Sequence, residues 1–204
     1  MLSNQHNNNP YYNILELLLL VTLSYYAMKE YFKNIPLDLI KLSNQDCTAT
    51  MYQGIWGINN ACIGSQIVDP SINKMNYKWI VRIDKMQENA EIGFISDFDI
   101  DCTISYTQSP QYVMDCKYGT ITICDEYADQ DSFRQNDGKQ GDIICLEFNV
   151  DGEGSYIKFS KNRSNKMCVI KSDEIKMGVK YTMAISLHLP TDSISIVDFE
   201  SNSL

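Results

Sequence analysis

The sequence predicts an all-β protein, an antiparallel two-sheet β-sandwich preceded by an N-terminal α-helix. After about residue 45, segments in which apolar and polar residues alternate are separated by turn residues, which is the pattern of half-buried strands. About ten such strands can be placed, and a series of short strands is typical of a sandwich. Residues 11–33, by contrast, contain no glycine or proline and read as helix.

The length predicts a single domain with a short appendage. A chain of 204 residues is the size of one domain, and a hydrophobic content of 44% suits a packed core. We expect residues 1–42 to comprise a polar, asparagine-rich disordered start and the apolar helix. Residues 43–204 are expected to form the sandwich.

The N-terminal helix is bounded by Pro10 and Pro36, and it is apolar on nearly every side. Such a helix requires burial, either on the sandwich or on a partner. A membrane span needs about 20 apolar residues, but only the twelve residues 17–28 separate Glu16 from Lys29. Burial in protein is therefore favoured, and membrane contact through residues 11–33 stays the alternative.

The clearest hairpin lies at residues 141–162. Residues 143–150 alternate, with Phe148 on the apolar face, and residues 151–154 contain two glycines suited to a hairpin loop. Residues 155–160 form the return strand. One dry face on this hairpin requires a second sheet to cover it.

A second hairpin lies at residues 76–96, where residues 76–84 alternate, a polar turn follows, and residues 92–96 return. Trp79 falls on the apolar face and is expected in the core. Residues 105–119 and 126–139 are expected to be loops. Further short strands are expected at residues 47–52, 120–124, 167–170, 182–187 and 194–199.

The order of several short motifs resembles the SPRY domain family over about residues 47–199. Tyr77 and Trp79 precede Ile92-Gly93, and Gly141-Asp142 opens the central hairpin. Its second strand contains Ile157-Lys158-Phe159-Ser160-Lys161-Asn162, and Ala184-Ile185-Ser186-Leu187 follows. The chain departs from the family at Glu147-Phe148-Asn149 and at Asn162-Arg163, so the peptide preferences of better-known members do not carry over.

The resemblance implies a bent, concanavalin-like β-sandwich without enzymatic chemistry, which binds a protein or peptide through loops at one edge. SPRY domains often serve as the substrate-recognition parts of ubiquitin ligases. Since this sequence has no RING-type spacing of cysteine and histidine, the resemblance implies an adaptor role in such a complex.

The net charge and the cysteine content limit the kinds of ligand that the protein is expected to bind. A net charge of −9 argues against binding nucleic acid, because that binding depends on lysine and arginine contacts with phosphates. Seven widely spaced cysteines include no C-x-x-C pair, so we expect reduced thiols in a cytoplasmic protein and no zinc site.

No catalytic constellation is present in the sequence. The two histidines, His6 and His188, have no recognisable partners, and the chain contains no G-x-S-x-G, phosphate loop or dinucleotide fingerprint. We therefore expect no enzymatic activity and no cofactor.

Partner-binding residues are expected on loops, because tyrosine, tryptophan and arginine most often anchor protein interfaces. Five loop residues fit this expectation: Tyr106, Tyr127, Phe133, Arg134 and Arg163.

A carbohydrate-binding sandwich of the legume-lectin type is the alternative function. Calcium could then be held near Asp97, Asp99 and Asp101, or by Asp125 and Glu126. The D-x-D-x-D run is not a calcium loop of the EF-hand type, because Cys102 stands where that loop needs glycine. We therefore predict no metal site, and expect a solvated acidic face.

Overall fold

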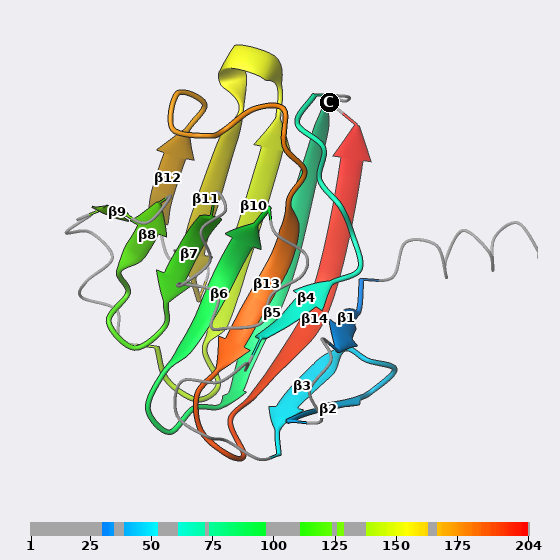
Figure 1. Ribbon diagram of the computed structural model, residues 1–204, viewed down its shortest axis with the longest axis vertical. Helices are drawn as coiled ribbons and strands as arrows, with labels where there is room; N and C mark the ends of the chain where they lie inside the picture. The colour runs from blue at the N-terminus through cyan, green and yellow to red at the C-terminus, as the bar shows by residue number, and fades with distance from the viewer. Residues whose placement is uncertain are drawn as a thin grey trace, which may run out of the picture.

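The computed structural model describes residues 30–34, 39–52, 61–71, 74–96, 111–123, 126–128, 138–162 and 167–203 (Figure 1). Most of the predicted helix, residues 11–29, lies outside these residues. Its last part does not: Phe32 and Lys33, predicted as helix, belong to strand β1 (Phe32–Asn34). Within the described ranges, no helix is long and apolar enough to cross a membrane.

Two seven-stranded antiparallel sheets pack face to face, as the sequence predicts (Figure 1). The first sheet has the order β1-β4-β13-β6-β7-β8-β9, and the second has the order β12-β11-β10-β5-β14-β3-β2. The first contains, besides β1, the strands β4 (Ala61–Gly64), β6 (Ala90–Ile95), β7 (Gln111–Asp115), β8 (Ile121–Ile123), β9 (Glu126–Ala128) and β13 (Thr182–Leu187). The second contains β2 (Ile40–Ser43), β3 (Thr48–Met51), β5 (Met75–Lys85), β10 (Ile143–Val150), β11 (Tyr156–Lys161), β12 (Met167–Lys171) and β14 (Ser193–Ser203).

Both predicted hairpin segments form strands. β10 pairs with β11 in a register that sets Phe148 opposite Ile157, and a short 3₁₀ turn (Gly152–Gly154) joins the two strands. On its other side β10 pairs with β5, where Leu146 lies opposite Trp79. The polar turn after β5 leads into β6, but that strand lies in the other sheet. The 76–96 segment therefore joins the two sheets instead of forming one local hairpin.

Two segments predicted as loops contain strands. The short apolar run Tyr112-Val113-Met114 forms β7, which pairs with β6 and β8 along its edges and has buried side chains on both faces. Residues 126–128 form β9 at the edge of the same sheet. Runs of three or four residues are too short for periodicity to distinguish a strand from a loop.

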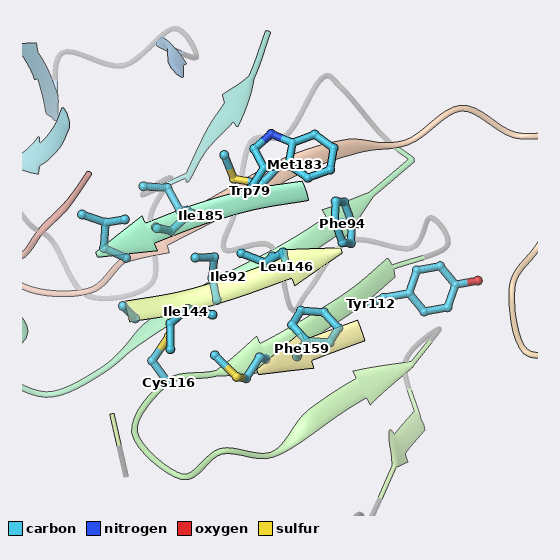
Figure 2. Packing of buried hydrophobic residues seen from close by; sticks show 14 of the residues in the cluster. Trp79, Ile92, Phe94, Tyr112, Cys116, Ile144, Leu146, Phe159, Met183 and Ile185 are labelled. Carbon is cyan, nitrogen blue, oxygen red and sulfur yellow. The ribbon is translucent and has the colours of Figure 1, made fainter. Parts of the chain in front are cut away.

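Aromatic rings from both sheets meet in the core (Figure 2). Trp79 of β5, fully buried, lies edge-on to Phe94 of β6 with ring centroids 5.3 Å apart, and Phe94 lies 5.3 Å from Phe148 of β10. Phe148 lies 5.5 Å from Tyr181, which precedes β13. The contacts thus alternate between the sheets, and the predictions that Trp79 and Phe148 are core residues are confirmed.

Gly93, part of the family-like Ile-Gly pair, has a packing reason to be glycine. A Cβ atom there would overlap the carbonyl oxygen of Tyr112 on β7. Glycine is therefore required at this position, because the backbones of β6 and β7 approach closely.

The strand directions separate two ends of the sandwich (Figure 1). We call the turn end the one that carries the β5–β6, β7–β8 and β13–β14 turns and residues 138–142, which precede β10. The opposite end carries the β4–β5 and β12–β13 connections and the 3₁₀ turn.

Replacing Phe148 by alanine should destabilise the protein by about 3–5 kcal/mol, because it leaves a cavity between Phe94 and Tyr181. Urea unfolding followed by circular dichroism measures the change. Val197→Ala is the control, since Val197 is 51% exposed and should lose little. Equal denaturation midpoints for wild type and Phe148→Ala would contradict the placement of this ring.

Candidate partner-binding site

A hollow of about 360 Å³ lies at the turn end, where turns from both sheets meet. It is lined by the β5–β6 turn, by the β7–β8 turn and by the segment before β10. The lining residues are Met86, Gln87, Glu88, Lys117, Tyr118, Gly138, Lys139 and Gln140.

Asp192, in the β13–β14 turn, holds the first wall of the hollow. Its carboxylate is fully buried and accepts hydrogen bonds from the backbone N–H of Gln87 (2.8 Å) and of Leu189 (2.8 Å). The side-chain amide of Gln87 donates to the carbonyl oxygen of Pro190 at 2.5 Å. These bonds join two turns that are about a hundred residues apart in the sequence, so the β5–β6 turn has little freedom to move.

Asn89 and Asp115 hold the second wall. The Asn89 amide donates to the Asp115 carboxylate at 2.7 Å, and its oxygen accepts the N–H of Lys117 at 3.1 Å. The other Asp115 oxygen accepts the N–H of Tyr118 at 2.9 Å. The backbone beneath Lys117 and Tyr118 is therefore fixed by side chains, as in Asx-type turns.

The third wall begins where Gly138 passes against the β7–β8 turn. Its N–H donates to the carbonyl oxygen of Cys116 at 2.6 Å, and a Cβ atom at this position would overlap that same oxygen. Gly141 has a φ of +90°, which glycine adopts without strain.

Asp142 completes the third wall. Its carboxylate accepts the N–H of Lys139 at 2.8 Å and the Asn162 amide at 2.7 Å, and it pairs with Lys161 at 3.1 Å. Partial burial raises the pKa of Asp142, but these donors outweigh burial and hold the pKa below its ordinary value. The family-like Gly141-Asp142 pair thus anchors this segment and does not itself line the hollow.

The side chains above this fixed backbone are exposed and polar. Tyr118 is 54% exposed, and the Lys117 ammonium lies 5.0 Å from the centre of its ring. The Tyr118 side chain, with smaller contributions from Glu88 and Asp115, raises the pKa of Lys117. Lys139 makes no ion pair with any described residue. An aromatic ring and two cations on a rigid base suit binding of a polar chain segment.

The described residues include no group of three or more histidine, cysteine or carboxylate side chains that could hold a metal. The acidic run at Asp97, Asp99 and Asp101 lies outside the described residues, as does Asp125, and the side chain of Glu126 is not described. Five cysteines in the described ranges are free; burial raises the pKa of the Cys62 thiol to about 12. Such a thiol is a poor nucleophile at neutral pH.

The sequence-predicted binding residues fall almost entirely outside the described ranges. Tyr106, Phe133, Arg134 and Arg163 are not described; Tyr127 lies in the edge strand β9, but its side chain is not described. Their described flanks lie at different ends of the sandwich. Gly138 and Asn162, which stand near Arg134 and Arg163 in the chain, belong to the turn end, whereas Gln111, which follows the segment with Tyr106, begins β7 at the opposite end (Figure 1).

Sequence reasoning missed the residues that line the hollow. Lys117, Tyr118 and Lys139 come from turns far apart in the sequence, and no local pattern marks them as neighbours. The available signal was an exposed tyrosine beside a glycine, Tyr118-Gly119, in a polar turn.

Comparison with solved structures identifies the fold class. The human HERC1 SPRY domain aligns with a TM-score of 0.59 at 16% identity, covering 79% of this chain and 93% of that domain. The TRIM65 PSpry domain aligns with a TM-score of 0.60 at 12% identity, covering 88% of this chain and 99% of that domain. The VIP36 exoplasmic/lumenal domain, solved in a Ca²⁺/Man₃GlcNAc-bound form, aligns with a TM-score of 0.52 at 8% identity, covering 88% of this chain and 86% of that one.

The protein therefore has a divergent SPRY-like fold, as the motif order predicts. No family model and no curated protein matches the sequence. Since the identities are low, the likeness establishes the architecture, and the binding surface has to be argued from this chain's own residues.

Asp192→Ala should destabilise the protein by a few kcal/mol, because it leaves two N–H groups without their acceptor and each costs about 1–3 kcal/mol. Chemical denaturation measures the loss. Asp173→Ala, at an exposed position, is the control and should unfold like wild type. If the two variants have the same midpoint, Asp192 does not hold the β5–β6 turn.

Proposed function

We propose that the protein is a non-enzymatic interaction module that binds a protein or peptide through the hollow at the turn end. The observation that carries the proposal is the contrast within this site: the buried Asp192 and half-buried carboxylates and amides fix the backbone, while the side chains of Lys117, Tyr118 and Lys139 are not buried. A site with a fixed backbone binds without a large ordering cost.

The chemistry of the hollow favours a ligand segment that carries hydrogen-bond acceptors or carboxylates. Lys117 and Lys139 are donors only, and Tyr118 offers both a ring face and a hydroxyl. Glu88 at the same rim would disfavour a ligand with closely spaced negative charges. A single acidic or amide side chain within an otherwise neutral peptide fits best.

The loop residues expected from the sequence extend this proposal. In the sequence, Phe133 and Arg134 come shortly before Gly138, and Arg163 follows Asn162. Because Gly138 and Asn162 belong to the turn end, we propose that these three residues enlarge the partner surface there. Tyr127 on the edge strand β9 would contribute from the side of the sheet, and Tyr106, which precedes β7 in the sequence, is proposed as a further contact.

Two narrower proposals rest on the sequence: the location on the widely spaced cysteines, and the adaptor role on the family resemblance. We propose that the protein is cytoplasmic and acts as an adaptor that brings its ligand to a ubiquitin ligase. Ligase subunits that purify together with the wild-type chain, and ubiquitin transfer to the captured partner, would support this role. Capture of a partner without any ligase component would remove it and leave the binding function standing.

The double variant Tyr118→Ala, Lys139→Ala should lose partner binding by about tenfold or more, because an anchor residue typically contributes more than 1 kcal/mol to an interface. The full-length chain is used as bait in a lysate of cells that make it, and proteins retained by wild type are identified and titrated. The thermal midpoint should stay unchanged, since both side chains are at the surface.

The matched control is Ile67→Ala, Lys176→Ala, which removes an exposed apolar side chain and a lysine at the opposite end. It should capture the same proteins as wild type. Equal capture by all three chains would place the binding surface elsewhere. Retention of glycoproteins alone, lost with EDTA or free sugar, would favour the carbohydrate-binding alternative.

The double variant Phe133→Ala, Arg134→Ala should weaken capture of the same partner and leave the thermal midpoint nearly unchanged, if these residues contact the ligand. The measurement is the same titration. Capture equal to that of wild type would remove both residues from the proposed surface without affecting the assignment of the hollow.

A further inference from the structure

A buried glutamate stands at the point where the N-terminal segment joins the sandwich. Glu30 lies two residues before the first residue of β1 and is only 2% exposed. One carboxyl oxygen, Oε2, accepts the Ser65 hydroxyl at 3.1 Å and the backbone N–H of Gln66 at 3.0 Å. The other oxygen, Oε1, is buried and has no hydrogen-bond partner among the described residues. A carboxylate buried with one oxygen unsatisfied is costly, whereas a neutral carboxyl group is much less so.

Besides Ser65 and Gln66, the Glu30 carboxyl group has the Gly64 backbone and the Trp79 indole ring as neighbours. A Cβ atom on Gly64 would overlap Oε1, so the carboxyl group lies directly against the β4 backbone. The Trp79 indole N–H is also buried and makes no hydrogen bond of normal geometry, but it lies close enough to the carboxyl group to act as a weak donor that favours the charged form. Burial nevertheless dominates, and raises the pKa of Glu30 from 4.5 to about 7, while the donors of Ser65, Trp79 and Gln66 lower it in part.

None of the titratable groups near this site supplies a positive charge to the carboxyl group. The Cys47 thiol contacts the Glu30 carbonyl oxygen at 3.6 Å, and Cys62 on β4 is a neutral thiol whose pKa burial raises to about 12. Lys33 on β1 is exposed, and Asp46 contributes its carbonyl oxygen to the N–H of Phe32. No ionised residue contributes to the shift at Glu30.

The strand that Glu30 fastens has few other attachments. β1 has three residues and pairs with β4 alone, with Phe32 opposite Gly64. Beyond this pairing, Tyr31 donates its N–H to the Ser65 hydroxyl at 3.3 Å, Phe32 donates its N–H to the Asp46 carbonyl oxygen at 2.7 Å, and the Phe32 ring is buried. Since such a short edge strand is marginal by itself, the state of the Glu30 carboxyl group should decide how firmly it is held.

We propose that β1 is a proton-controlled latch, which is closed on β4 while the Glu30 carboxyl group is neutral and loosened when that group ionises. The pKa of Glu30 in the closed state, about 7, is above its ordinary value of 4.5. The protonated form is therefore favoured in the closed state, and its stabilisation is complete below pH 4.5. It is lost as the pH rises through the interval up to about 7. One proton is involved, so the closed-to-open ratio should fall by up to tenfold per pH unit, or on the order of hundredfold in total.

Hydrogen exchange of the Tyr31 and Phe32 amides tests the latch in the full-length chain. Wild type and Glu30→Gln, a neutral isostere, are compared at equal pH between pH 5 and 8, so that the intrinsic pH dependence of exchange cancels. We expect the protection of these amides, relative to the variant, to fall on the order of hundredfold over this range, while β10 and β13 amides stay unchanged. The same pH dependence in both chains would overturn the proposal, and would assign any shared change to other groups, His188 included.

Gly64→Ala provides a second test that keeps the glutamate. Its Cβ atom should displace the carboxyl group from β4, which opens the latch at every pH and removes the pH dependence. In the Glu30→Ala background the same substitution should have little effect, because the overlapping atom is absent. If Gly64→Ala opens β1 equally with and without Glu30, the carboxyl group does not hold β1 on β4.

Fluorescence provides a third measurement. In a Trp56→Phe background, the fluorescence of Trp79 should follow the same transition with pH. A signal that is constant with pH would contradict ionisation of a carboxyl group beside the indole.

Discussion

The structure depends on the aromatic contacts between the two sheets. Trp79, Phe94, Phe148 and Tyr181 come alternately from one sheet and the other, with ring centroids 5.3–5.5 Å apart. Aromatic side chains bury large areas and pack with preferred edge-on geometry, so this series joins the sheets and also sets how they face each other. The Tyr112 ring lies 5.6 Å from that of Tyr181, and both hydroxyl groups donate to the β12–β13 connection: Tyr112 to the Glu174 carbonyl oxygen at 3.0 Å, and Tyr181 to that of Lys176 at 2.7 Å. The core thereby also positions the β12–β13 connection at the opposite end.

At the turn end, polar side chains replace apolar packing as the source of order. Asp192, Asp115 and Asp142 each accept a backbone N–H group from a turn, and each also joins parts of the chain that are distant in the sequence, through Gln87, Asn89 and Asn162 respectively. A buried carboxylate that is satisfied by N–H donors is tolerated, because the hydrogen bonds to the charged form offset its desolvation. The result is a largely polar surface on a backbone that these side chains hold in place.

Glu30 differs from these aspartates in its hydrogen bonding and in its pKa. Asp142 has several donors and a pKa below its ordinary value, whereas Glu30 leaves one oxygen unsatisfied and has a pKa of about 7. A sequence selected for stability alone would place an apolar or a fully hydrogen-bonded residue against Gly64 and Trp79. The two acids differ in burial and in charged partners: Glu30 is almost completely buried and no ionised residue contributes to its pKa, whereas Asp142 is only partly buried and pairs with Lys161.

How much was predictable from the sequence follows from the range of each interaction. Alternation along residues 143–150 and 76–84 is a local property, and it determined the strands, the inward faces and the placement of Trp79 and Phe148. The order of short motifs indicated the SPRY-like sandwich. The strands β7 and β9 escaped prediction because they are too short for periodicity, and Phe32 was misassigned because pairing with β4 overrode helical propensity.

Only the tertiary structure decided which residues share a site. The three walls of the hollow come from positions near 87, 117 and 139, and the turns that meet there are joined by hydrogen bonds between residues as far apart as Gln87 and Asp192. Likewise, nothing local distinguishes Glu30 from the exposed acids of this chain; its burial depends on Gly64 and Trp79, which the sheet pairing brings to it. The hydrophobic periodicity of a strand is a property of residues that are neighbours in the sequence. Sites made of polar side chains depend on contacts between residues that are far apart in the sequence, and these contacts form only when the sheets have packed.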